Sequence, residues 1–383
     1  MKKILRITTV PISLRTLLKG QPKFMSQYYE VVGVTSSGKE IDDVVKNEDI
    51  RVIEVEMTRT ISPIKDLVSL WKLYKVIKKE KPFIVHSHTP KAGTLGMIAS
   101  KLAGVPNRLH TIAGLPLLEA TGAKRKLLDT VEKITYACAT KIYPNSLGLK
   151  DIIIQNRYTK PSKLKVIANG SSNGIDVNHF SIENVSAETT SALREELYIN
   201  ESDIVFVFVG RLVTDKGINE LIDAFKKLSK DHQNIKLLLV GTLESELDPL
   251  QDSTLNEIEN NKNIINVGWQ TDVRPYFAIS SILTFPSYRE GFPNVVMQAG
   301  AMGLPSIVTD INGCNEIIKH KINGLIIPPK DENELYLAML NLVKNPNESK
   351  KMANASRKMI CDNYQRQVIW EALLQEYKNL ENN

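Results

Sequence analysis

Three observations predict an α/β protein with parallel, doubly wound sheets. Short runs rich in Val, Ile and Leu alternate with segments of helical periodicity along most of the chain. The run 204–209 is apolar at every position, as expected for a strand buried on both faces of a parallel sheet. The 383 residues exceed one ordinary hydrophobic core, so we expect two domains, 1–170 and 171–365.

The first half carries strand-like runs separated by helix-length segments. The expected strands are 3–9, 29–35, 50–56, 83–86, 108–112, 141–146 and 165–170. The expected helices are 13–27, 63–79, 94–103 and 122–140. Helical spacing is clearest in 63–79, where the recurring residues are Ile64, Leu67, Val68, Leu70, Trp71, Tyr74 and Ile77.

The second half repeats the alternation. Residues 171–202 are polar and rich in turn formers, which places the domain boundary at their start. The expected strands are 204–209, 235–241, 264–268, 282–285 and 305–308, and the chain from 332 onward is mainly helical. In parallel sheets of this kind, ligands bind beyond the carboxyl ends of the strands.

The net charge of +6 conceals an uneven distribution. Residues 1–170 carry 29 Lys and Arg against 14 Asp and Glu, whereas the remainder carries 20 against 29. Solvated helix faces explain part of this, but a basic half also suits an anionic surface. The chain has no zinc-finger spacing, aromatic RNA-binding motif or basic region with heptads, so an anionic membrane is favoured and no nucleic acid is expected.

The expected helix 122–140 begins with a basic cluster, 124–126. It is either a packed amphipathic surface helix or a contact with a membrane surface. No window approaches ~18 uninterrupted apolar residues, and the basic N-terminus is predicted to be a first strand rather than a signal peptide. The three cysteines lack metal-ligand spacing, and the chain has no Asp-x-Asp motif, so no metal is expected.

Histidines gather at two predicted strand ends of the first half. His88 and Lys91 follow one strand, and His110 lies near the end of another. Such side chains can bind a phosphate or assist proton transfer. His86 and His110 can instead be packed inside the sheet. His88, flanked by turn formers, is the stronger functional candidate.

A loop with two cations, Gly210 to Gly217, follows the strand 204–209. Arg211 and Lys216 stand five residues apart in it, which suits a clamp for a diphosphate. The alternative is a solvated loop with two surface cations. The loop lacks the Gly-x4-Gly-Lys-Ser/Thr order, and the chain has no Gly-x-Gly-x-x-Gly fingerprint.

The stretch 289–299 has the pattern of a loop entering a helix. Glu290 precedes a Gly-Phe-Pro-Asn turn, and an Ala-, Gly- and Met-rich helix follows, with Gln298 two turns inside it. The first N–H groups of a helix lack partners within it and favour a negative group. Glu290 and Gln298 are therefore placed to contact different parts of one long ligand.

Three motifs together resemble the family 4 glycosyltransferases. They are Gly210-Arg211-Leu212 with Lys216-Gly217, Glu290-Gly291-Phe292-Pro293-Asn294, and residues 310–316. The resemblance covers essentially the whole chain and implies the GT-B fold, in which two Rossmann-like domains face a central cleft. It also implies that a helix at 366–383 crosses back onto the first domain.

The resemblance implies a retaining, metal-independent hexosyl- or N-acetylhexosaminyltransferase without a cofactor. Within the family, the chain is similar to bacterial transferases of capsule, exopolysaccharide or lipopolysaccharide O-antigen assembly. The donor would be a nucleotide sugar of the UDP type. The acceptor would be a polyprenyl-diphosphate-linked saccharide, which places the enzyme as a peripheral protein on the cytoplasmic face of the membrane.

The resemblance also implies the roles of particular residues. Arg211 and Lys216 would hold the donor diphosphate, Glu290 would accept hydrogen bonds from sugar hydroxyls, and His88 would border the reacting groups. The other donor-side residues would be Gly210, Gly268, Trp269, Gly291, Phe292, Pro293, Asn294, Val295 and Gln298. His110, Lys91 and Arg15 would lie on the acceptor or sugar side.

Three departures from the family pattern concern these roles. Gln298 stands where the paired-glutamate motif has its second Glu, so it would meet the ribose without a charge, at a cost on the order of 1 kcal/mol. Ala113 stands where many relatives have a histidine, which leaves the role of His110 open. The early loop also lacks a glycine pair, and Arg15 and Lys19 are candidates to face an acceptor diphosphate instead.

Two alternative functions stay open at this point. A nucleotide-sugar 2-epimerase of the same fold would convert the donor without any acceptor. A non-catalytic nucleotide-sugar-binding subunit, suggested by Gln298 and Ala113, would bind the donor without transferring its sugar.

Overall fold

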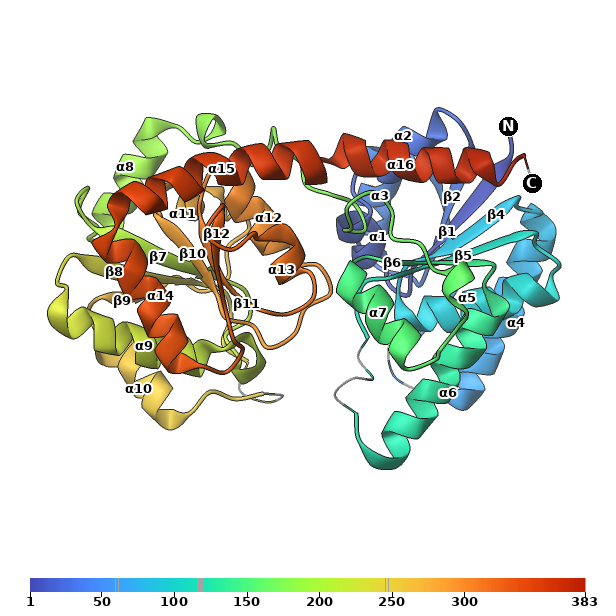
Figure 1. Cartoon of the computed structure of the whole chain (residues 1–383). Coiled ribbons are helices and arrows are strands. Elements are labelled where there is room, and N and C mark those ends of the chain that lie inside the picture. Colours follow the sequence, from blue (N-terminus) through green and yellow to red (C-terminus); the bar gives the residue numbers. More distant parts are fainter. Residues whose placement is uncertain are drawn as a thin grey trace. The chain divides into compact units, whose positions relative to one another are not determined.

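The computed structural model of the protein describes residues 1–58, 60, 62–115, 117, 120–244, 246 and 248–382. The chain forms two compact units, Met1–Gly174 with Gln367–Asn383 and Ile175–Arg366 (Figure 1). Within the described residues, each unit has one six-stranded sheet in which all strand pairs are parallel. The predicted α/β architecture with two doubly wound parallel sheets is confirmed.

The first sheet has the strand order β3-β2-β1-β4-β5-β6. Its strands are β1 (Lys3–Ile7), β2 (Glu30–Thr35), β3 (Arg51–Glu54), β4 (Ile84–Ser87), β5 (Asn107–Ile112) and β6 (Lys141–Pro144). Side chains alternate between the faces, so Ile4 and Leu5 belong to different hydrophobic clusters. The chain order reverses between β1 and β4, the position at which such sheets bind ligands.

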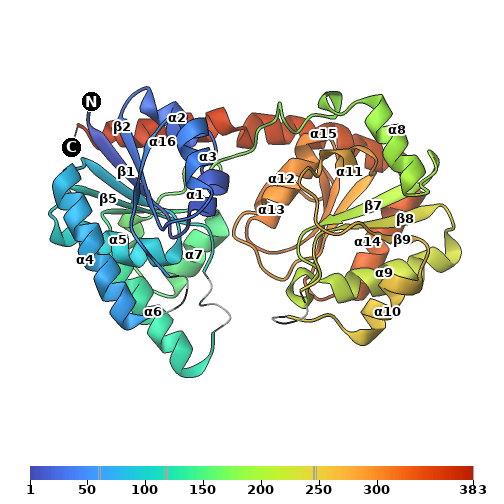
Figure 2. The ribbon, with the colours of Figure 1, turned by 180° about the vertical axis from the view of Figure 1, so that it is seen from behind.

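Helices cover both faces of this sheet (Figures 1 and 2). One face packs against α4 (Pro63–Glu80), α5 (Pro90–Leu102), α6 (Gly122–Cys138) and α7 (Leu147–Gln155). The other packs against α1 (Pro11–Leu17), α2 (Gln21–Ser26), α3 (Ile41–Glu48) and α16 (Arg366–Asn379). Leu373, Leu374 and Tyr377 of α16 are buried there against Ile4 and Leu14, so the last helix completes the core of the first unit.

The second sheet has the order β12-β11-β10-β7-β8-β9, which is the same winding as the first. Its strands are β7 (Ile204–Val209), β8 (Ile235–Val240), β9 (Ile264–Asn266), β10 (Ile282–Phe285), β11 (Ser306–Thr309) and β12 (Gly324–Ile327). The helices are α8 (Ala187–Glu196), α9 (Ile218–Asp231), α10 (Asp252–Asn260), α11 (Arg274–Ala278), α12 (Asn294–Ala301), α13 (Cys314–Ile317), α14 (Glu332–Lys344) and α15 (Pro346–Tyr364). The order reverses between β7 and β10, which places the loops after these two strands at the ligand-binding position.

Two predicted elements of the first unit were wrong. The single helix expected at 13–27 is two short helices, because Gly20 adopts a left-handed φ of 82° between them. The strand expected at 165–170 is a turn, since Ala168 and Gly170 have φ values of 47° and 102°. In the second unit, β12 was not expected, whereas the helical character after residue 332 is confirmed.

Candidate active site

The loop between β7 and α9 places Lys216 at the carboxyl edge of the second sheet. Residues Thr214–Lys216 form one 3-10 turn, and Gly217, with a φ of 71°, is the N-cap of α9. A Cβ on Gly217 would lie 2.2 Å from the carbonyl oxygen of Pro286. Only glycine therefore allows this loop to approach the end of β10 so closely.

Lys216 and Glu290 form an ion pair where the two loops meet. Lys216 Nζ lies 2.5 Å from Glu290 Oε1, and the two side chains are 15% and 18% exposed. The Ser287 hydroxyl lies 3.1 Å from the same carboxylate oxygen and 3.4 Å from Lys216 Nζ. The pair is thus partly withdrawn from water, which strengthens its charge-assisted hydrogen bonds.

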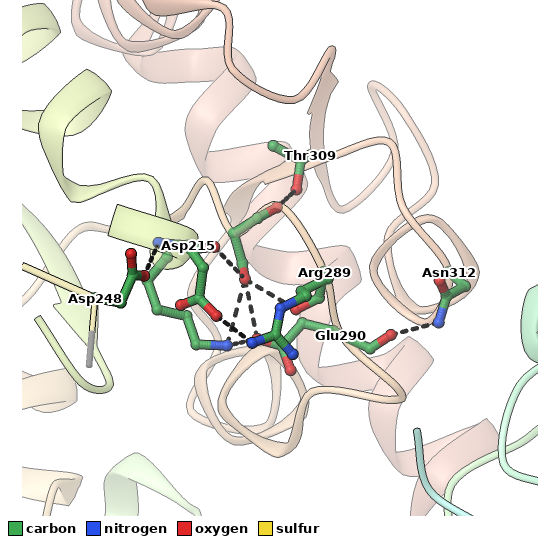
Figure 3. A network of polar contacts seen from close by, with 8 residues as sticks. Asp215, Asp248, Arg289, Glu290, Thr309 and Asn312 are labelled. Atoms are coloured by element: carbon green, nitrogen blue, oxygen red, sulfur yellow. Dashed lines mark hydrogen bonds and ion pairs between the residues drawn. The ribbon is translucent and has the colours of Figure 1, made fainter. Parts of the chain in front are cut away.

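The loop that carries Glu290 is held by the last residue of β11 and by residues just after that strand. Thr309 Oγ1 donates to the carbonyl oxygen of Ser287, and Asn312 Nδ2 donates to that of Glu290 (Figure 3). A Cβ on Gly313, whose φ is 78°, would lie 2.5 Å from the carbonyl oxygen of Gly291. These contacts hold the backbone of the loop, so the direction of the Glu290 side chain is set before a ligand binds.

Asp215 joins the two loops a second time. Its Oδ2 lies 2.6 Å from Arg289 Nη2, and its carbonyl oxygen accepts a 2.9 Å hydrogen bond from Tyr288 N. Its own N–H donates to Asp248 Oδ2 over 2.6 Å (Figure 3). Asp215 and Arg289 therefore form a second ion pair between the same two loops. In this pair the acid lies on the loop of Lys216 and the base on the loop of Glu290.

Arg211 was predicted to act with Lys216, but it has a different partner. Arg211 Nη1 lies 2.8 Å from Glu244 Oε2, and the Arg211 side chain is 46% exposed. Among the described residues, no hydrogen bond or ion pair joins Arg211 to Lys216 or Glu290. An exposed ion pair contributes little to stability, so an anionic ligand can displace Glu244 at small cost.

Helix α12 begins directly after the turn 291–293. Pro293 is its N-cap, and no side chain caps its first turn. The N–H groups of this turn lack partners inside the helix, and the helix dipole adds partial positive charge there. Asn294 is exposed and Val295 half-buried, whereas the Phe292 ring is buried 5.4 Å from the Tyr364 ring. Phe292 thus anchors the turn, and the helix end is suited to an anion.

Four other predicted donor-side residues lie on this edge or the neighbouring loops. Gln298 is half-buried and is the fifth residue of α12, one turn inside the helix and not two. The N–H of Gly210 donates to Val240 O over 2.9 Å, and Gly268 O accepts from Gly241 N over 2.8 Å. Trp269 is 67% exposed, so its ring is available to stack on a planar group such as a base.

In the first unit, His88 lies in a buried polar network around Arg6. Arg6 is fully buried, and its Nε donates to His88 Nε2 over 3.0 Å. Its guanidinium also donates to the Tyr377 hydroxyl over 3.1 Å and to Gln21 Oε1. Because Nε2 of His88 accepts, the neutral ring carries its proton on Nδ1. His88 therefore presents Nδ1–H as a hydrogen-bond donor.

His88 lines a small cavity with Asn145 and Ser172. The cavity volume is about 20 Å³. His88 Nδ1, Asn145 Oδ1 and Ser172 Oγ are buried and have no hydrogen-bond partner among the described residues. The volume suits one water molecule, which would satisfy these groups until a ligand replaced it.

His86 and His110 are packed inside the sheet. His86 Nδ1 lies 2.6 Å from the Tyr377 hydroxyl, and Nε2 lies 2.7 Å from Thr111 Oγ1. His110 Nδ1 lies 2.9 Å from Ser87 Oγ, and the ring covers Gly93, where an added Cβ would be 2.3 Å from Cε1. These contacts agree with the alternative that His86 and His110 are packing residues of the sheet.

Lys91 and Arg15 each hold a carboxylate of a neighbouring helix. Lys91 Nζ lies 2.6 Å from Asp66 Oδ2 of α4, and Arg15 Nη1 lies 2.9 Å from Asp43 Oδ2 of α3. The predicted acceptor-side residues are thus distributed over separate contacts and are not gathered into one cluster.

The buried histidines are expected to make folding stability fall as the pH is lowered. Burial lowers the pKa of His86 and His88 well below 6.5, and it lowers that of His110 to about 4. The unfolded chain takes up these protons near pH 6.5 and the folded chain only at lower pH, so acidification favours unfolding. From about pH 7.5 to about pH 5.5, urea unfolding should report a loss of roughly 1 kcal/mol per histidine.

His110→Gln tests this pH dependence. Over this pH range, the stability of the variant should fall by roughly a third less than that of the wild type, because the variant lacks one of the three buried histidines. His232→Gln, at the C-terminal end of α9, is the control and should retain the full loss. Equal pH dependence in His110→Gln and the wild type would contradict the assignment.

The described part of the chain lacks two further features. No group of three or more His, Cys, Asp or Glu side chains there is arranged to hold a metal ion. No helix there combines the length and apolarity needed to cross a bilayer.

Three residues of the site were not singled out by the sequence. Asp215 adjoins Lys216, Ser287 lies three positions before Glu290, and Asn312 lies inside the 310–316 motif. Each is polar and stands just after a predicted strand, which was the available signal. Asp215 meets Arg289 from 74 positions away, Ser287 meets Lys216 from 71 and Asn312 meets Glu290 from 22, so these contacts could not be derived from local pattern.

The chain matches two family models. The model described as "Glycosyl transferases group 1" matches residues 189–359, and the model described as "Glycosyl transferase 4-like" matches residues 17–146. The first match covers the site loops of the second unit, and the second covers most of the first sheet.

Similar proteins include two curated transferases and one solved structure. The capsular polysaccharide biosynthesis glycosyltransferase CapM of Staphylococcus aureus is 34% identical over 378 residues, which are 98% of this chain and 97% of that protein. The UDP-Gal:alpha-D-GlcNAc-diphosphoundecaprenol alpha-1,3-galactosyltransferase of Escherichia coli is 32% identical over 292 residues, 75% of this chain and 73% of that protein. HepE of Anabaena, solved with UDP, has the same fold, with a TM-score of 0.80 and 18% identity over 99% of this chain and 100% of HepE.

Proposed function

Because this chain belongs to the family 4 glycosyltransferases, we propose that it moves a sugar from a UDP-linked donor to a lipid-linked saccharide with retention of anomeric configuration. The observation that carries the proposal is the Lys216–Glu290 pair, held by two loops where the chain order of the second sheet reverses. The pair offers a cation to a phosphate and a carboxylate to sugar hydroxyls.

The donor is proposed to lie beyond the carboxyl ends of β7 and β10. Its diphosphate meets Lys216, Arg211 and the first turn of α12, which offers N–H groups and partial positive charge. Glu290 then exchanges its contact with Lys216 for sugar hydroxyls, and Gln298 meets the ribose. The name of the E. coli relative specifies UDP-Gal, and HepE was solved with UDP, which supports a uridine nucleotide.

The transfer breaks the bond between the anomeric carbon and the β-phosphate oxygen and forms a bond to the acceptor oxygen. On the proposed front-face route, the acceptor proton passes to the departing phosphate oxygen, so charge balances without a protein base. Lys216 and Arg211 stabilise the negative charge that develops on the nucleotide diphosphate. We propose that these cations suffice and that no metal ion or other cofactor takes part.

The acceptor is proposed to be a polyprenyl-diphosphate-linked saccharide used in surface polysaccharide assembly. The names of the S. aureus and E. coli relatives, which specify capsular polysaccharide and a diphosphoundecaprenol substrate, support this class. His88 would donate its Nδ1–H on the acceptor or sugar side. An acceptor anchored in lipid further implies that the enzyme works as a peripheral protein on the cytoplasmic face of the membrane.

UDP is expected to raise the melting temperature of the wild type but not that of Lys216→Ala. A ligand that binds only the folded state stabilises it by about 2.7 kcal/mol at a hundredfold excess over its Kd. UMP lacks the β-phosphate, so it should produce a smaller shift than UDP at equal concentration. Differential scanning fluorimetry measures the shift of the wild type with UDP, of Lys216→Ala with UDP and of the wild type with UMP.

The control for this experiment is Lys226→Ala. Lys226 also pairs with a glutamate, with 2.7 Å between Lys226 Nζ and Glu257 Oε2, but on the outer surface of α9 and α10. This variant should keep the full response to UDP. If UDP shifted Lys216→Ala as much as the wild type, Lys216 would not contact the diphosphate.

A further inference from the structure

Helix α4 exposes an apolar surface along its first nine residues. Ile64, Leu67, Val68 and Trp71 are 81%, 66%, 51% and 57% exposed. They recur at intervals of three and four residues, so they lie on one side of the helix. The opposite side packs into the core of the first unit through Leu73 and Ile77. The helix is therefore apolar toward solvent as well as toward the sheet.

The same side of α4 continues as a row of lysines. Lys72, Lys75, Lys78 and Lys79 are all exposed, and none forms an ion pair with another described residue. Lys75 Nζ lies 5.2 Å from the centre of the Trp71 ring. We call these four lysines and the four apolar residues together the outer face of α4.

The carboxylates of α4 do not neutralise this row. Asp66 Oδ2 lies 2.6 Å from Lys91 Nζ on α5. Glu80 Oε2 lies 2.8 Å from Lys3 Nζ and 2.7 Å from Arg51 Nη2, and these contacts lower the Glu80 pKa to about 2. Both acids therefore pair with cations outside this row. The pKa of the nearby Glu56 is lowered by hydrogen bonds from Ser37 and also by the charge of Lys72. One such carboxylate does not balance four lysines, so the outer face keeps a net positive charge.

A surface depression of about 410 Å³ borders the outer face, beside the end of α5. Its lining is apolar and aromatic, formed by Leu67, Leu70, Trp71, Tyr74 and Leu102. Leu102 is itself 64% exposed, and the Trp71 and Tyr74 rings are stacked with centroids 5.4 Å apart. Figure 2 shows α4 lying beside α5.

The lysines and apolar side chains of the outer face fit an anionic membrane better than they fit a second copy of the chain. In a symmetric pair of copies, the same surface meets itself, so the lysine rows would approach one another and repel. An anionic lipid surface instead attracts the lysines and accepts the apolar side chains at the depth of the headgroups. Tryptophan is enriched at that depth, because one side of its ring is apolar and its N–H is polar.

We propose that the outer face of α4 docks the enzyme on an anionic membrane, with Leu67 and Trp71 inserted among the headgroups. This inference rests on the proposed function, since it names the surface that brings the enzyme to a lipid-linked acceptor. It assigns to α4 the membrane contact for which the basic start of α6 was the candidate.

Vesicle binding tests the proposal. The full chain should bind vesicles of phosphatidylcholine with about one third phosphatidylglycerol and bind phosphatidylcholine alone far more weakly. Changing Lys75, Lys78 and Lys79 to Gln should weaken binding about fivefold for each charge removed. Leu67→Ser with Trp71→Ser should weaken it at least about tenfold. Co-sedimentation measures both.

Matched variants of the second unit are the controls. Lys350→Gln with Lys351→Gln removes two exposed lysines of α15, and Leu337→Ser removes an exposed apolar residue of α14. Both should bind vesicles as the wild type does. Brominated phosphatidylcholine should quench tryptophan fluorescence in the wild type but not in Trp71→Phe, whose binding is retained.

Three results would overturn the proposal. They are unchanged vesicle binding in the α4 variants, quenching that persists in Trp71→Phe, and self-association in sedimentation velocity that the α4 variants abolish. The last would identify a second copy as the partner. The rise in melting temperature with UDP is a separate measurement. If UDP did not raise the melting temperature of the wild type, the proposed donor would be wrong. If it still raises that of the α4 variants, these variants are folded.

Discussion

Lys216→Ala is expected to lower the rate of sugar transfer by about 10²–10³-fold, because removing one preorganised group at a developing charge has an effect of this size. The ammonium lies 2.5 Å from Glu290 Oε1 and is only 15% exposed, so water replaces it poorly. The loss should appear in kcat, since the charge on the leaving diphosphate grows as the transition state is reached. Release of UDP in the presence of membrane-extracted acceptor measures it.

Lys226→Ala supplies the matched control for the transfer assay as well. It removes a lysine from the more exposed Lys226–Glu257 pair and should change the rate by less than about twofold. Lys216→Arg keeps the charge but alters its geometry and should fall between the wild type and the alanine variant. Near-normal transfer by both Lys216→Ala and Glu290→Ala would refute the site.

Gly217→Ala is expected to impair both stability and transfer. Its φ of 71° costs an L-residue roughly 1–2 kcal/mol, and the added Cβ would lie 2.2 Å from the Pro286 carbonyl oxygen. Relief of that overlap moves the Lys216 loop away from the Glu290 loop. We therefore expect a total loss of about 3 kcal/mol in stability and a fall in transfer at temperatures where the variant is folded.

Gly303→Ala separates the cost of the positive φ from the cost of the overlap with the Pro286 carbonyl oxygen. Gly303 has a similar φ of 84°, but an added Cβ would meet nothing within 4 Å. It should lose only the conformational part, roughly 1–2 kcal/mol, and keep full transfer activity. Thermal unfolding and the transfer assay compare the two variants. Equal loss in both would mean that the approach to Pro286 does not matter.

The sheets and the candidate donor site were largely predictable from sequence. The continuous apolar run 204–209 predicted a central strand, and β7 has these bounds. Lys216 and Glu290 each follow a predicted strand, and parallel strands bring their carboxyl ends to one edge. Their ion pair is therefore a consequence of a pattern that local residues encode.

Other parts of the site depended on partners that are remote in sequence. Arg211 follows the same strand as Lys216, yet its partner Glu244 lies 33 positions away and outside the Lys216–Glu290 pair. His88 was predicted as a functional residue, but its tautomer is set by Arg6, 82 positions earlier. The Tyr377 hydroxyl meets His86 from 291 positions away, because α16 completes the core of the first unit.

The sequence by itself determined which segments become strands and helices and which loops carry charge, because side-chain periodicity and turn residues are local properties. Only the tertiary structure decided which side of α4 is buried. Helical spacing marked Ile64, Leu67, Val68 and Trp71 together with Ile77, but packing against the sheet buries Ile77 and turns the other four toward solvent. Periodicity identifies an apolar helix, whereas the side that is covered depends on contacts between segments distant in the chain.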